Sequence, residues 1–189
     1  QTKACQNFLQ KSGIPIVQIM ELLAEPIDMN VGLAHGRAGY DVAKHLLAQG
    51  YHHIGFIGAR MDPRVQQRMH GYKLALEQEG KFNKNYMVTT PEASSVGMGG
   101  QLFKSLMSIS QGQVDAIFCA NDDLALGALF EAQRMNINVP QDLAICGFND
   151  TETAKYVNPS LTSVSVGRYE MGVKAAELII RELTNKPIE

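Results

Sequence analysis

The sequence has few cysteines and none in metal-binding spacing. Its 189 residues include Cys5, Cys119 and Cys146 but no CxxC motif. An odd number of widely spaced thiols argues against both a disulfide framework and a zinc site. Cys119 and Cys146 each lie in an apolar run, where a free cysteine packs as a small hydrophobic side chain. We therefore expect no metal, and a reducing, cytoplasmic compartment.

The chain also lacks an excess of positive charge and any long apolar stretch. Its 17 basic and 19 acidic residues give a net charge of −2, unlike a protein that binds nucleic acid by itself. If the parent protein binds DNA, another segment must supply the positive charge. No apolar run approaches the length of a membrane span, and the first residues have no apolar core typical of a signal peptide.

Motifs for nucleotide binding and hydrolysis are absent as well. No GxGxxG follows the first apolar run, and GxxxxGK[ST], HExxH and GxSxG do not occur. His52 and His53 would point to opposite faces of a strand, so they make a poor metal pair. Asp122 and Asp123 could form an acid/base pair, but acids at the positive end of a helix explain them as well. We expect His35 on the surface or in the core, and we predict no enzyme activity and no cofactor.

Apolar runs alternate with amphipathic segments along the chain. Runs rich in β-branched residues predict strands buried on both faces. The expected strands are 14–20, 53–59, 86–89, 115–120, 143–148 and 160–166. The expected helices are 3–12, 36–49, 64–79, 95–109, one that begins at 122, and 168–184. This order predicts an α/β fold with parallel sheets and helices on both faces.

Polar residues follow most of the predicted strands, at the edge where ligands bind in parallel sheets. Asparagine and aspartate can hydrogen-bond vicinal hydroxyls, and the arginine fork suits a carboxylate or a phosphate. The positions concerned are Glu21, the stretch 60–68, Asn121, Asp122, Asn149, Asp150 and Arg168. Because no nucleophile lies among them, the pattern favours binding of a small polar ligand over catalysis.

Three stretches together resemble the lactose/galactose-repressor (LacI/GalR) family of transcriptional regulators. Residues 48–76 contain Arg68, Gly71 and Tyr72 in the spacing of the family's R-x-x-G-[FWY] motif. Residues 115–152 contain NDDLALG and VPQDLAICGFND, and residues 158–172 contain NPSLTSV. Within this family the sequence is most similar to the gluconate-operon repressors.

The resemblance implies a two-lobed, periplasmic-binding-protein-like sensor that binds its effector between the lobes. Residues 1–58 and 167–189 would form an incomplete N-terminal lobe, and residues 59–166 the C-terminal lobe. The DNA-binding head would be absent from this chain. The parent protein would be a repressor and a homodimer that contacts DNA only through that head, since a two-fold protein matches a palindromic operator.

The resemblance also implies a set of ligand-binding residues: Glu21, Arg64, Arg68, Asn121, Asn149 and Arg168. Asn149 stands where the family usually has an aspartate, and Arg168 where it often has an aromatic ring. Both departures make the site more positive, which favours a sugar acid such as gluconate, or a sugar phosphate, over a neutral sugar. Alternatively, Arg64 could be a solvated charge, Arg68 could pair with a carboxylate such as Glu21, and Arg168 could lie on the surface.

Two other functions remain open on the sequence alone. A periplasmic sugar-binding protein of a transporter has the same two-lobed fold and would need a secretory leader. An enzyme on this scaffold would need a nucleophile or a phosphate loop, and neither is found. The motifs VPQDLAICGFND and NPSLTSV resemble the regulators more than the transport proteins.

Overall fold

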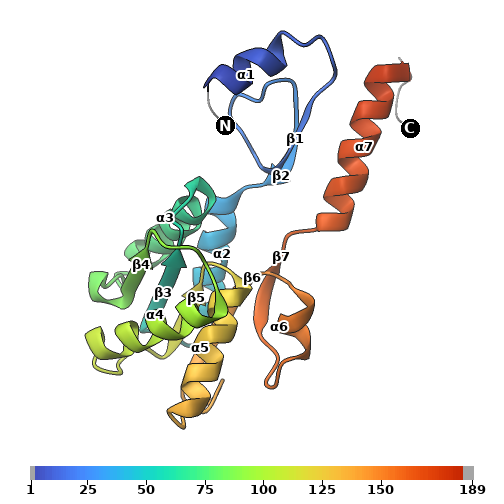
Figure 1. The fold of residues 1–189 in the computed structure, drawn as a ribbon. Helices are drawn as coiled ribbons and strands as arrows, with labels where there is room; N and C mark the ends of the chain where they lie inside the picture. The colour runs from blue at the N-terminus through green and yellow to red at the C-terminus, as the bar shows by residue number, and fades with distance from the viewer. Residues whose placement is uncertain (1–2, 185–189) are drawn as a thin grey trace. The chain divides into compact units, whose positions relative to one another are not determined.

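The protein is described by a computed structural model over residues 3–184 (Figure 1). The chain divides into two compact units, which we describe separately. The smaller unit contains residues up to Ala34 and from Gly167 onward, and the larger unit contains His35–Val166. The larger unit therefore begins at His35, whereas the sequence analysis expected it to begin at residue 59. The reason is that residues 35–58 supply a helix and a strand that pack within the larger unit.

The larger unit is built on a single parallel sheet. The strand order is β4-β3-β5-β6-β7, and Phe56 lies opposite Phe118 in the register of β3 and β5. From β3 the chain goes to one edge as β4 and then returns across β3 to form β5, so the order reverses between β3 and β5. The strands are β3 (Ile54–Ala59), β4 (Met87–Thr90), β5 (Ala116–Cys119), β6 (Ala144–Asn149) and β7 (Thr162–Ser165).

The helices of this unit pack in pairs. Helix α2 packs along α3, and α4 along α5. Right-handed crossovers place the two pairs on opposite faces of the sheet, which confirms the predicted α/β architecture. The helical segments are α2 (His35–Ala48), α3 (Pro63–Gln78), η1 (Lys84–Tyr86), α4 (Val96–Ile109), α5 (Asp122–Arg134) and α6 (Glu152–Tyr156). The short segments η1 and α6 were not predicted, because a single turn leaves too little periodicity to detect.

Aromatic side chains fill the core on the α2–α3 side of the sheet. Phe118 lies 5.4 Å from Phe56 and 6.4 Å from Phe148, measured between ring centroids. Tyr72 of α3 is fully buried against Phe56 and donates its hydroxyl hydrogen to the carbonyl of Ile54 at 2.7 Å. These contacts tie three neighbouring strands to one helix.

The two strand cysteines belong to the core, as the sequence predicts. Cys119 and Cys146 are both buried as free thiols, whereas Cys5 is exposed. Burial raises the pKa of Cys146 to about 12 and raises that of Cys119 as well. A thiol that stays protonated is a poor nucleophile, which fits a packing role.

Glycines allow α2 and α3 to approach backbone to backbone. A Cβ atom added at Gly71 would lie 1.9 Å from the carbonyl oxygen of Gly36, and one at Gly39 would lie 2.1 Å from that of Arg68. The same holds for α4 and α5, where a Cβ at Gly99 would lie 2.4 Å from the carbonyl oxygen of Leu124. Gly99 therefore allows the close packing of α4 against α5, although glycine by itself disfavours a helix.

The smaller unit contains a two-stranded parallel sheet of β1 and β2, with α7 in contact with both strands. Strand β2 was not predicted, since its sequence MNVGL contains a glycine and an asparagine instead of a continuous apolar run. Asn30 of β2 stabilises this sheet by donating to the carbonyls of Gln18 and Glu21. The elements of the smaller unit are α1 (Lys3–Gln10), β1 (Val17–Glu21), β2 (Met29–Leu33) and α7 (Arg168–Thr184).

None of the helices within residues 3–184 combines the length and the apolar character that crossing a bilayer requires.

Replacing Gly71 by alanine should destabilise the protein by about 3 kcal/mol, because the new methyl group would overlap the Gly36 carbonyl and force the helices apart. Chemical denaturation measures this change. The matched control is Gly97→Ala in α4, where the nearest atom to the added Cβ is 3.9 Å away. That variant should be as stable as the unmodified protein or up to about 1 kcal/mol more stable, since alanine favours helix. Equal stability of the two variants would contradict the close-packing argument.

Candidate functional site

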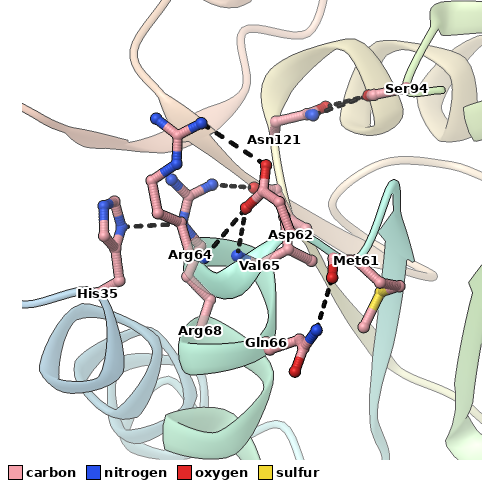
Figure 2. Close-up of polar contacts among 10 residues, drawn as sticks. His35, Met61, Asp62, Arg64, Val65, Gln66, Arg68, Ser94 and Asn121 are labelled. Atoms are coloured by element: carbon pink, nitrogen blue, oxygen red, sulfur yellow. Dashed lines mark hydrogen bonds and ion pairs between the residues drawn. The ribbon is translucent and has the colours of Figure 1, made fainter. Parts of the chain in front are cut away.

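The reversal of strand order marks the place in the larger unit where a ligand would bind. In open parallel sheets, ligands bind outside the carboxyl ends of the strands at such a switch point. Here the point lies between β3 and β5. The segment after β3 leads into α3 with Arg64 and Arg68, and Asn121 lies two residues after the end of β5 as the N-cap of α5. Figure 2 shows these three residues on neighbouring elements.

Arg68 is the most buried of the predicted site residues, with 6% of its surface exposed. Its Nη1 donates to the carbonyl oxygen of Ala120 at 2.6 Å, and its Nε donates to Nδ1 of His35 at 3.1 Å (Figure 2). The guanidinium carbon also lies 3.6 Å from the centre of the Phe148 ring. Arg68 thereby joins α3 to α2, β6 and the end of β5.

The charge of Arg68 is poorly compensated. Burial, and to a smaller extent the like charge of Arg64, lower the pKa of Arg68 to about 10, although the charges of Asp62 and Asp122 act in the opposite direction. The group therefore stays cationic at neutral pH. No carboxylate within residues 35–166 forms an ion pair with it. Its hydrogen-bond acceptors are a carbonyl oxygen and an imidazole nitrogen, neither of which carries a negative charge. A buried cation in such surroundings favours an anionic ligand.

Arg64 lies one turn before Arg68, at the start of α3. Its guanidinium is 3.6 Å from the carboxylate of Asp62, and 38% of its side chain is exposed. Asp62 also caps the helix by accepting from the amides of Arg64 and Val65 (Figure 2). Arg64 is therefore partly neutralised and partly solvated, which makes it a weaker anion ligand than Arg68.

Asn121 caps a helix in addition to lying at the candidate site. Its Oδ1 accepts from the amide of Leu124 at 3.0 Å and so caps α5. Its Nδ2 donates to the hydroxyl of Ser94 at 2.7 Å (Figure 2). This second bond fixes the orientation of the amide beside the switch point.

Asn149 ends β6 immediately after Phe148, whose ring supports Arg68. It is half-buried, and both it and Asp150 have positive φ angles, 111° and 53°. Such angles are uncommon outside glycine and are most often tolerated by asparagine and aspartate. The turn after β6 therefore adopts an unusual backbone conformation next to a predicted ligand contact.

The other two predicted site residues lie in the smaller unit. Glu21 is the last residue of β1 and is half-buried, and Arg168 is the first residue of α7 and is exposed. The larger unit thus brings together Arg64, Arg68 and Asn121, with Asn149 linked through Phe148. A role in binding for Glu21 and Arg168 stays a prediction.

Sequence reasoning missed the roles of His35 and Phe148 at this site, and it placed Asp122 at the same edge of the sheet without identifying what it supports. His35 is 1% exposed, and its role as the acceptor for Arg68 depends on a contact that no spacing reveals. Asp122 is equally buried, and both of its oxygens accept hydrogen bonds from other elements. Phe148 could have been identified from the sequence as a neighbour of the site, since it directly precedes the polar residues at the end of a predicted strand. Among residues 3–184, no group of His, Cys, Asp and Glu side chains could hold a metal ion.

Asn121→Ala should lower the free energy of unfolding by about 1 kcal/mol, because α5 loses its cap and Ser94 loses its partner. Asn121→Ser should cost about 0.5 kcal/mol or less, since serine caps helices nearly as well. Thermal or chemical denaturation of the two variants measures the difference. If both lose the same stability, the cap is not the main structural contribution of Asn121.

Comparison with known proteins gives concordant matches. A family model described as a periplasmic binding protein-like domain matches residues 43–189. The transcription regulator GntR from Chromobacterium violaceum superposes with a TM-score of 0.93 at 34% identity, over 98% of this chain and 68% of that one. A LacI family transcriptional regulator from Silicibacter pomeroyi gives 0.90 at 30% identity, over 97% and 68%.

A curated relative gives the same picture. The HTH-type transcriptional regulator GntR of Pseudomonas aeruginosa is 38% identical over 188 residues, which is 100% of this chain and 54% of the relative. The chain therefore spans about half the length of the curated relatives it matches. The sheet topology, the switch point and these similarities lead to one conclusion: the chain belongs to the LacI family of transcriptional regulators, in which it corresponds to the periplasmic binding protein-like domain.

Proposed function

We propose that this chain is the ligand-sensing part of a sugar-responsive transcriptional repressor and that its effector is a small sugar acid of the gluconate type. The observation that carries the proposal is the buried, cationic Arg68, whose hydrogen-bond acceptors are not carboxylates and which lies at the switch point of the sheet. An aldonate combines one carboxylate with several hydroxyls. That combination matches one arginine fork beside neutral amides.

In the proposed complex, Arg68 binds the ligand carboxylate and Arg64 adds longer-range attraction. The amides of Asn121 and Asn149 hydrogen-bond the hydroxyls, as donors and as acceptors. Asn149 in place of an aspartate removes a negative charge that would repel the carboxylate. Glu21 and Arg168 are further ligand contacts in this proposal, supported by the family resemblance alone.

The proposed mechanism is a shift between conformations of the sensor. A ligand changes an equilibrium only by the difference in its affinity for the two states. In the intact repressor, a conformation favoured by the effector would change the geometry of the DNA-binding heads and so the affinity for the operator. We propose that the parent protein is a cytoplasmic homodimer and that it contacts DNA only through a head outside this chain. The matched transcriptional regulators favour this function over that of a transport protein or an enzyme.

Titration calorimetry should show that gluconate binds at least about tenfold more tightly than glucose, because only the acid can form a charged bond with Arg68. The two ligands carry similar hydroxyl groups, so their difference isolates the carboxylate. Equal or tighter binding of glucose would rule out the sugar-acid assignment.

Arg68→Lys should weaken gluconate binding by about tenfold or more, since an ammonium cannot reproduce the fork that contacts Ala120 and His35. The matched control is Arg134→Lys, a change of the same kind at an exposed position of α5 that pairs with Glu131. The control should bind gluconate as the unmodified protein does. A similar loss in both variants would indicate a general effect of arginine replacement and not a role at the site.

A further inference from the structure

The acidic residue that follows Asn121 supports a different part of the site. Asp122 is the first residue of α5, a position where acids commonly occur because of the helix dipole. Yet its side chain is only 1% exposed, and its two carboxylate oxygens are used away from its own helix. The helix dipole alone would not require this burial.

Both oxygens of Asp122 bind the segments around the turn after β6. Oδ2 accepts from the backbone amide of Thr151 at 2.7 Å, and Oδ1 accepts from the hydroxyl of Ser163 on β7 at 2.6 Å. The oxygen of Ser163 in turn accepts from the amide of Asp150 at 2.9 Å. A single carboxylate therefore holds two successive backbone amides of this turn, one directly and one through a hydroxyl.

The turn held in this way has a conformation that needs support. Asn149 and Asp150 have φ angles of 111° and 53°, in the region that side chains rarely adopt. Space for the carboxylate comes from Gly147 on β6, where a Cβ atom would lie 2.2 Å from Oδ1 of Asp122. A side chain at position 147 would thus collide with the carboxylate that holds the turn.

We propose that Asp122 and Ser163 form an anchor that positions Asn149 for the ligand without touching the ligand themselves. This inference rests on the proposed function, since it takes Asn149 as a ligand contact. The anchor holds Asp150 and Thr151, and their backbone fixes the direction in which Asn149 leaves the strand. Asp122 and Ser163 are positioning residues in this proposal.

The test combines binding with a double-mutant cycle. Ser163→Ala should weaken gluconate binding at least about fivefold in titration calorimetry. In the Asn149→Ala background the same change should have no further effect, because the side chain that it positions is gone. Ser163→Thr, which keeps the hydroxyl, should restore binding. Thr162→Ala, at an exposed position one residue earlier on β7, is the control and should leave binding unchanged. Unchanged binding in Ser163→Ala, or additive losses in the double variant, would overturn the proposal.

A second measurement separates the anchor from the choice of ligand. Amide hydrogen exchange of the ligand-free protein, followed by NMR, should be faster at Asp150 in Ser163→Ala than in the unmodified protein. It should also be faster at Thr151 in Asp122→Ala. Should Asp122→Ala fail to fold, the serine variant still decides the outcome. If the unmodified protein binds neither gluconate nor glucose, the proposed function fails, while unchanged exchange at both amides would disprove the anchor whatever the ligand is.

Discussion

The guanidinium of Arg68 is a charged group in a place that is almost closed to water. Transfer of a charge from water to such a place costs several kcal/mol unless other groups replace its hydration. In this protein the replacements come from separate elements: a carbonyl at the end of β5, an imidazole on α2 and an aromatic ring on β6. The position of each element is therefore constrained by the same cation.

The packing of the helices and the geometry of the site are connected. His35 reaches Arg68 because α2 lies directly against α3, and this approach depends on glycines on both helices. Gly71 lies one turn after Arg68, and Gly39 packs against the Arg68 backbone itself. A change in the separation of the two helices would thus move the acceptor away from the guanidinium, which makes helix packing part of the binding chemistry.

Two adjacent residues at the start of α5, Asn121 and Asp122, have different hydrogen-bonding roles near the switch point. Asn121 caps the helix and presents a neutral amide that is fixed by Ser94. Asp122 turns into the protein and binds the turn after β6. Its negative charge also raises the pKa of Arg68, against the larger lowering that burial causes. Arg68 therefore stays cationic without an ion pair to any carboxylate of the larger unit.

The parallel α/β architecture, most of the strands and the edge of the sheet where polar residues gather could be predicted from the sequence. These features follow from local periodicity and from strand ends, which lie close together in any parallel sheet. Arg68 and Asn121 could be identified in this way, with their roles assigned by family resemblance.

Strand β2 was missed because MNVGL has no apolar run, and the start of the larger unit at His35 depends on which helix α2 packs against. The partners of the buried side chains could be found only in the folded structure: His35 and Phe148 for Arg68, and Ser163 for Asp122. Those partners are distant along the chain, and burial and hydrogen-bond geometry between distant residues arise only when the elements pack together.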